Sequence, residues 1–129
     1  MSVPSRHRDA LVSQSEGRLT LTRHPDGCLL MFPRTVWEQK RIEIAAWPLS
    51  VKHWQRVFLG NASDVEMDGS GRVLISPELR KATGLAHDST VMLLGMGSHF
   101  EIWEASAHEK NEAATLAGGL PDDLKHFSF

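Results

Sequence analysis

Histidine is the residue type that first suggests catalysis or metal binding, because the 129-residue chain contains seven of them. Imidazole is both a general acid–base group and the commonest metal ligand. No two histidines form the H-E-x-x-H arrangement that places two ligands and a base on one helix face. We therefore expect surface or turn positions for all seven: His7, His24, His53, His87, His99, His108 and His126. The sequence predicts a protein that is not an enzyme, with no catalytic residue, no metal site and no cofactor.

Two glycine-containing stretches match phosphate-binding loops only in part. Gly95-Met96-Gly97 opens like a dinucleotide-binding loop, but Phe100 stands where the third glycine is required and the segment links two strand-like runs. Gly69-Ser70-Gly71 is not followed by the Gly-Lys-Ser/Thr of a P-loop. Both stretches are therefore predicted to be turns.

The charge balance is close to neutral, with 14 basic and 16 acidic residues, a formal net charge of −2 and a pI near 6.4. Any DNA binding must therefore come from a local basic patch. No apolar run reaches the roughly 18 residues of a membrane span. The single cysteine, Cys28, cannot form an internal disulfide and is predicted to be a small buried hydrophobic residue in a reducing compartment. These features indicate a cytoplasmic protein.

The elements that would position such residues occur twice in the same order. Each copy has an extended residue, a proline and a short basic helix, then two strands joined by a glycine-containing turn, then a second helix. These parts fall at 2–11, 19–32 and 33–38 in the first copy, and at 74–85, 90–103 and 104–109 in the second. Each fragment is common by itself, but finding both in one order favours an internal duplication.

A helix over 48–60 connects the two copies, with Val51, Trp54 and Phe58 on one face. It is predicted to pack one copy onto the other. Val65 and Met67 then alternate with charged residues, which indicates a strand leading into a tight turn. The tryptophans stand among apolar residues and are predicted to pack in the core rather than to stack on bases: Trp37, Trp47, Trp54 and Trp103.

The last segment follows a Gly118-Gly119 break and places Leu120, Leu124 and Phe127 on one helical face. We expect this apolar face to dock onto its own subunit or onto a neighbouring one.

The chain resembles the MraZ family of bacterial transcription regulators, which have two fused swapped-hairpin, AbrB-like halves. In that family each half opens with a strand, an Asp-x-x-x-Arg turn, a strand ending in proline and a short helix. Matching residues over essentially the whole chain lie at 2–11, 56–62, 68–72, 76–80 and 100–103. The usual first strand and first Asp-x-x-x-Arg turn would lie before Met1, so the first half is expected to be incomplete.

The resemblance implies an α+β fold, mainly β, in which tandem AbrB-like half-barrels form a pseudo-twofold barrel with flanking helices. It divides the chain into a first half with its helix, a connecting helix, a second half with its helix, and a tail. The corresponding residues are 1–47, 48–61, 62–117 and 118–129.

The resemblance also implies a regulator that binds repeated sites in the promoter of its own cell-division and cell-wall gene cluster. Its partners would be double-stranded DNA and further copies of itself in a ring, with no membrane, and it would be cytoplasmic and associated with the nucleoid. Two alternatives stay open. One is an antitoxin-like regulator with the same hairpin unit, and the other is a ring-forming scaffold without DNA activity, which the near-neutral charge favours.

Arg72 is the candidate for reading DNA, since an arginine at a tight turn can bridge guanine O6 and N7 or clasp a phosphate. Asp68 and Gly71 would shape this turn. The basic residues of the short helices are candidates for phosphate contacts: Arg6, Arg8, Arg80 and Lys81. The alternatives are an ion pair from Arg72 to Asp68 or Asp64 that only holds the hairpin, and an ordinary solvated face for the helix residues.

Overall fold

A computed structural model describes residues 1–86 and 90–128, so His87 lies outside the described residues. The α-helices are α1 (Ser5–Ser15), α2 (Arg34–Ala45), α3 (Lys52–Gly60), α4 (Pro77–Thr83) and α5 (Ala105–Ala117). The strands are β1 (Arg18–Arg23), β2 (Leu29–Pro33), β3 (Ser63–Glu66), β4 (Val91–Gly95) and β5 (Phe100–Glu104), and two short 3-10 helices are η1 (Leu49–Val51) and η2 (Asp122–Leu124). No helix in the described ranges is both long enough and apolar enough to cross a membrane.

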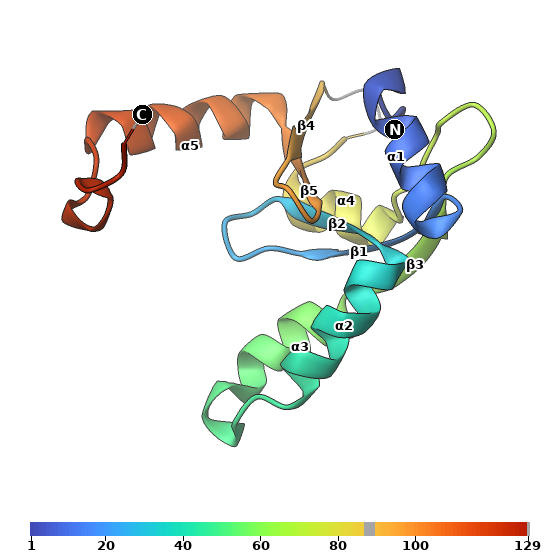
Figure 1. The fold of residues 1–129 in the computed structure, drawn as a ribbon, viewed down its shortest axis with the longest axis horizontal. Coiled ribbons are helices and arrows are strands. Elements are labelled where there is room, and N and C mark those ends of the chain that lie inside the picture. Colours follow the sequence, from blue (N-terminus) through green and yellow to red (C-terminus); the bar gives the residue numbers. More distant parts are fainter. Residues whose placement is uncertain (87–89, 129) are drawn as a thin grey trace.

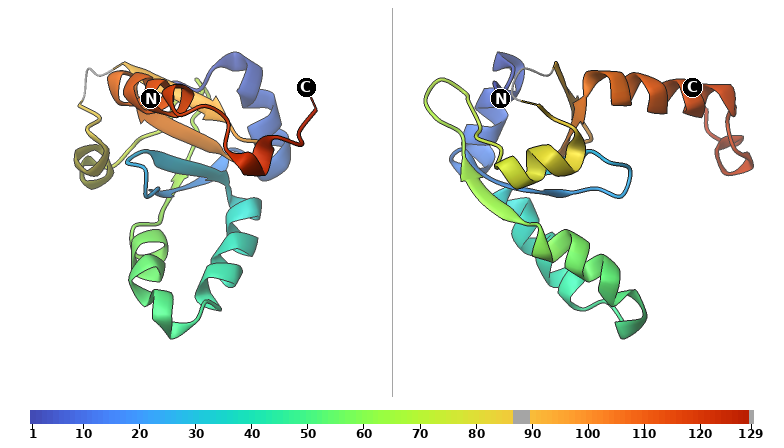
Figure 2. Two further views of the ribbon diagram at one scale, coloured as in Figure 1. Left: turned by 90° about the vertical axis from the view of Figure 1, so that its left-hand side faces the viewer. Right: turned by 180° about the vertical axis from the view of Figure 1, so that it is seen from behind.

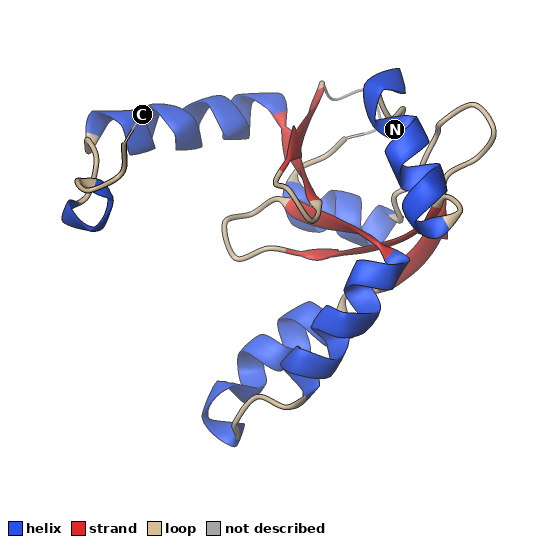
Figure 3. Ribbon diagram, viewed as in Figure 1, coloured by secondary structure: helices blue, strands red, loops and turns tan. Residues whose placement is uncertain are grey.

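The strands form one antiparallel sheet in the order β3-β1-β2-β5-β4 (Figure 1). The hairpins β1–β2 and β4–β5 are the two predicted ones, and they join through β2 and β5, where Leu30 pairs with Glu101. β3 adds to the free edge of β1. The α+β class is confirmed, and both helices and strands are seen in Figure 3. The expectation of a mainly β fold is not matched, because about 46% of the described residues are helical and 22% are in strands.

Two apolar clusters lie on opposite faces of the sheet. The larger one joins the first residues of the chain to both hairpins and to α1 and α4, and consists of Val3, Leu11, Leu19, Leu21, Leu29, Met31, Val73, Ile75, Leu79, Leu85 and Ile102. The smaller one lies under α2 and contains Leu30, Phe32, Trp37 and Ile44. Because successive side chains of a strand point to opposite faces, β2 feeds both clusters and is buried along its whole length.

The connecting helix does not join the two copies as predicted. α3 packs against α2 and β1, which belong to the first copy, and the α2–α3 pair projects from the sheet (Figures 1 and 2). This projection also explains a second correction. Trp37 and Trp103 are buried as predicted, but Trp47 and Trp54 are 37% and 48% exposed. No described element covers the outer end of the α2–α3 pair, where these two side chains lie.

The C-terminal segment does not dock onto the sheet of its own chain. α5 packs against β4 and β5 and then extends away from the body of the molecule (Figure 1). Leu120, Leu124 and Phe127 are 56%, 46% and 63% exposed. Docking onto a neighbouring subunit stays a prediction.

Arg34, at the start of α2, holds two strands together. One terminal nitrogen, Nη2, donates to the carbonyl oxygens of Leu19 on β1 and Val65 on β3, both at 2.9 Å. Nε lies 3.8 Å from a carboxylate oxygen of Asp64, which also accepts a hydrogen bond from Thr20 at 2.9 Å. This arginine therefore fixes the strand that leads into the predicted DNA-binding turn.

Replacing Arg34 by Met should lower the free energy of unfolding by about 1.5 to 3 kcal/mol, because the carbonyls of Leu19 and Val65 lose a charged donor. Arg41→Met on the same helix is the matched control, since Arg41 is half exposed and Glu38 is its one ion-pair partner among the described residues. Its effect should stay within about 0.5 kcal/mol. Urea unfolding of both variants measures the difference, and equal losses would show that Arg34 does not clamp the strands.

Candidate nucleic-acid interface

The turn from Asp68 to Arg72 is closed by its own backbone and by one carboxylate. The Asp68 amide donates to the Arg72 carbonyl at 2.9 Å, and the Gly71 amide donates to the Asp68 carbonyl at 3.0 Å. Oδ1 of Asp68 accepts hydrogen bonds from the amides of Ser70 at 2.8 Å and Arg72 at 2.9 Å. Gly71 adopts a φ of 75°, which favours glycine. The residue types predicted to shape this turn therefore shape it.

The same contacts stabilise the ionised form of Asp68. The amide of Arg72 is the largest cause that holds the pKa of the Asp68 carboxyl below its ordinary value, and the Ser70 amide and the charges of Arg72 and Arg8 act in the same direction. Desolvation opposes them. The turn is thus tightest when Asp68 is charged.

Residues 1–3 lie antiparallel to residues 71–73 and direct Arg72 outward. The Val3 amide donates to the Gly71 carbonyl and the Val73 amide donates to the Met1 carbonyl, each at 2.7 Å, with Ser2 opposite Arg72. Val3 and Val73 are buried, whereas Ser2 and Arg72 are exposed. Because side chains alternate along paired extended chains, burying the two valines forces Arg72 to face solvent.

Arg8 and Arg80 make equivalent contacts in the two copies. Nε of Arg8 donates to the Val3 carbonyl at 2.7 Å, and Nε of Arg80 donates to the Ile75 carbonyl at 3.2 Å. Each arginine therefore reaches back from its helix to the extended segment before it. The Arg8 guanidinium also lies against Gly71, where a Cβ would collide with it.

Positive charge gathers around the start of the chain. The pKa of the Met1 amino group is lowered first by burial and then by the charges of Arg80 and Arg72. The structure thus brings Arg8, from the start of the chain, close to Arg72 and Arg80 of the second copy.

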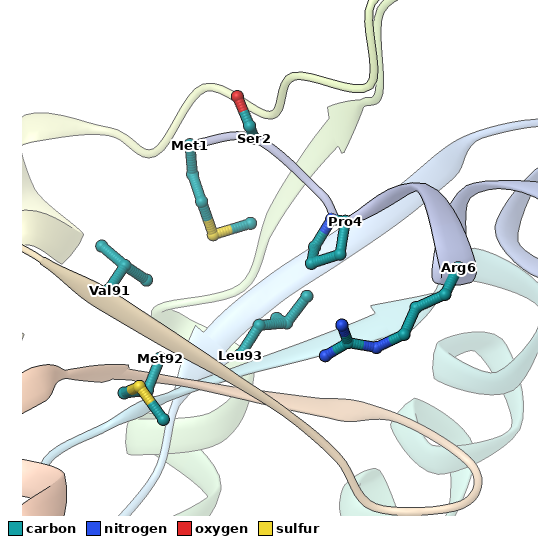
Figure 4. A pocket seen from close by; sticks show the side chains of 7 residues that line it. All are labelled: Met1, Ser2, Pro4, Arg6, Val91, Met92 and Leu93. Atoms are coloured by element: carbon teal, nitrogen blue, oxygen red, sulfur yellow. The ribbon is translucent and has the colours of Figure 1, made fainter.

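Arg6 and Lys81 are placed apart from this group. Arg6 faces β4 across a cavity of about 430 Å³ between the N-terminal segment and that strand (Figure 4). Its Nε donates to His7 at 3.2 Å. Lys81 is exposed on α4. No hydrogen bond or ion pair within the described ranges links either residue to the Asp68–Arg72 turn.

The alternative of an Arg72–Asp64 ion pair is wrong, because Asp64 is engaged by Arg34 and Thr20 instead. Nor do the described residues include an ion pair between Arg72 and Asp68, although the charge of Arg72 helps to lower the pKa of Asp68. Among the residues that the structure describes, the guanidinium of Arg72 has no hydrogen bond or ion pair. It is positioned by its backbone and left open to a ligand.

Sequence reasoning missed two features. Arg34 had a local signal, since it directly follows Pro33 at a junction between strand and helix. The second feature is a group of three possible metal ligands, His24, Cys28 and Glu101. It had no local signal, because Glu101 comes from the other hairpin.

Comparison with known proteins decides the family. A family model described as "MraZ protein, putative antitoxin-like" matches residues 58–118. The transcriptional regulator MraZ of Janthinobacterium sp. (strain Marseille) is 67% identical over 129 residues, covering 100% of this chain and 89% of that protein. Those of Herminiimonas arsenicoxydans and Bordetella pertussis are each 62% identical with the same coverage. The chain belongs to the MraZ family.

Membership of the MraZ family confirms the resemblance that was based on the 68–72 turn and on the other matching segments of the sequence. The relatives carry the name of transcriptional regulators, which places this chain in a family whose role is regulation. Arg72 lies within residues 58–118, which the MraZ family model covers.

Gly71→Ala should destabilise the protein more than Gly97→Ala does. Both glycines have positive φ, of 75° and 89°, so each alanine costs about 1 to 2 kcal/mol of backbone strain. Only at Gly71 would the new Cβ also displace Arg8, since nothing lies within 4 Å of a Cβ at Gly97. Thermal and urea unfolding compare the two variants, and equal losses would contradict the Arg8–Gly71 contact.

The carboxyl carbon of Asp68 should titrate below its ordinary value of 3.8 in an NMR pH titration. Because the folded-state pKa is lowered, the stabilisation by Asp68 is present above the unfolded value and is lost as the pH falls through the folded value. An Asp68 midpoint at or above 3.8 would contradict the hydrogen-bonded turn.

Proposed function

We propose that this MraZ protein is a sequence-specific DNA-binding regulator and that the Asp68–Arg72 turn presents Arg72 to double-stranded DNA. The observation that carries the proposal is an exposed guanidinium that makes no hydrogen bond or ion pair with the described residues, on a backbone that is hydrogen-bonded on both sides. A planar fork held in this way suits bidentate contact with guanine or phosphate. Because the net charge of the protein is −2, its affinity for DNA must come mainly from such a local group of basic side chains.

Arg8 and Arg80 are proposed to bind phosphates beside Arg72. Their Nε atoms are used to anchor them, and this leaves the terminal nitrogens of each guanidinium for an anion. Arg6 and Lys81 are proposed as outer phosphate contacts, since both are exposed on the helices that follow the extended segments. Each neutralised phosphate adds about 0.9 to the slope of log affinity against log salt concentration.

A ring of subunits is the proposed solution to the weakness of a single turn. One bidentate guanine contact contributes about 1 to 3 kcal/mol of discrimination, which is too little for a regulator. A homo-oligomer presents several copies of the turn, and their contributions to binding combine when the DNA sites have the same spacing as the turns. The exposed apolar surfaces at Trp47 and Trp54 and at Leu120, Leu124 and Phe127 support an assembly that covers them.

The proposed target is the promoter of the protein's own cell-division and cell-wall gene cluster, which the family resemblance implies, with the protein cytoplasmic and associated with the nucleoid. A second candidate is an antitoxin-like regulator that uses the exposed tail to bind a toxin. The description of the matching family model as antitoxin-like favours this candidate.

Arg72→Ala should weaken binding to a duplex covering the proposed promoter at least about fivefold, because a lost bidentate contact removes about 1 kcal/mol or more. The salt slope should also fall by about 0.9 for each phosphate contact that disappears. Fluorescence anisotropy at several salt concentrations measures both quantities.

Arg41→Ala is the matched control, because it removes an equally charged and half-exposed side chain on α2, away from the turn. It should change the affinity less than twofold. Equal affinities for the wild type and Arg72→Ala would contradict the proposal, and so would the absence of any binding at low salt, which is the behaviour of a scaffold.

A further inference from the structure

Three metal-ligating side chains meet where the β1–β2 turn approaches β5. His24 directly follows β1, Cys28 directly precedes β2 and Glu101 lies on β5. One ligand atom from each lies within 4.8 Å of the other two. The turn is closed by a hydrogen bond from the His24 amide to the Cys28 carbonyl at 3.0 Å, and the pairing of Leu30 with Glu101 fixes β5 beside it.

The carboxylate of Glu101 is already oriented toward His24. Its Oε1 accepts a hydrogen bond from the indole Nε1 of Trp103 at 2.9 Å, and Trp103 is only 5% exposed. The other oxygen, Oε2, lies 4.0 Å from Nε2 of His24. One oxygen is thus used for positioning, and the other faces the imidazole.

His24 also has a second carboxylate in the place where histidine ligands commonly have one. Its Nδ1 accepts from the Asp26 amide at 3.0 Å and lies 3.7 Å from Oδ2 of Asp26. With a metal on Nε2 the proton would move to Nδ1, which would give up the hydrogen bond from the Asp26 amide and could instead donate one to the Asp26 carboxylate. A carboxylate on the far nitrogen fixes the tautomer and raises the basicity of the ligand.

The donor set selects the type of metal. A thiolate, an imidazole and a carboxylate together suit zinc, whereas calcium and magnesium prefer oxygen ligands alone. Tetrahedral zinc bonds of about 2.0 to 2.3 Å place the ligand atoms about 3.3 to 3.8 Å from one another. Rotation of the partly exposed His24 and Glu101 side chains can close the remaining distance.

We propose that His24 Nε2, Cys28 Sγ and Glu101 Oε2 bind one zinc ion, with its fourth position open to water. Cys28 is 1% exposed, while the side chains of Glu101 and His24 are 13% and 26% exposed, so the site is closed on the sheet side and open on the other. Because two ligands come from the first hairpin and one from the second, the ion would link the two hairpins. The proposed site shares no residue with the Asp68–Arg72 turn.

Cobalt(II) is the probe, added to the full-length protein after chelation of bound metal. The wild type should take up one equivalent and show the near-ultraviolet charge-transfer absorption of a cobalt–thiolate bond, which zinc then abolishes. His24→Gln and Glu101→Gln should each bind cobalt at least tenfold more weakly, and Cys28→Ala should lack the absorption. His126→Gln, which removes an exposed histidine of the tail, should match the wild type.

Absence of the charge-transfer absorption in the wild type would overturn the proposal and would leave Cys28 as a core residue only. Wild-type cobalt affinity in both His24→Gln and Glu101→Gln would overturn it as well. Circular dichroism without metal checks that each variant folds. If Cys28→Ala fails this check, the two partly exposed positions decide the question, since neither alters the core.

Discussion

The pairing of residues 1–3 with residues 71–73 is the constraint from which the arrangement of the site follows. It buries Val3 and Val73 in one apolar cluster, and this burial turns Ser2 and Arg72 outward. A shift of one residue in this register would place Arg72 in the core and a valine in solvent. The cost of burying an unpaired charge therefore secures the exposure of Arg72.

The contacts of Arg8 and Arg80 show how a nearly neutral chain can concentrate positive charge. Each guanidinium is held by a backbone carbonyl of the extended segment before its helix, and the two segments lie side by side. Arg8 and Arg80, which are far apart in the sequence, therefore lie on neighbouring segments of the fold. The equivalence of these contacts is what a duplicated unit would produce, although the duplication itself stays a prediction. The same juxtaposition of hairpins brings Glu101 to His24 and Cys28.

Local patterns predicted the elements well, because both hairpins, the helices after them and the tight turn depend on residues close in sequence. Predictions that depended on packing between elements fared worse. Trp54 lies on the apolar face of α3 as predicted. The sequence of this helix does not reveal that, among the described residues, no other element covers the outer end of that face. The Arg34 clamp and the His24–Cys28–Glu101 group were missed because their partners come from other strands. Arg72 was identified through the family resemblance, and its lack of an ion pair required the structure.

Backbone and arginine side-chain NMR spectra of the protein with and without its promoter duplex test the central claim most directly. The account predicts that the guanidinium signal of Arg72 and the amides of the Asp68–Arg72 turn shift on DNA binding, with smaller shifts for Arg8 and Arg80. Signals from the outer end of the α2–α3 hairpin should stay in place. DNA-induced shifts confined to other elements, with the Arg72 signal unchanged, would contradict the account.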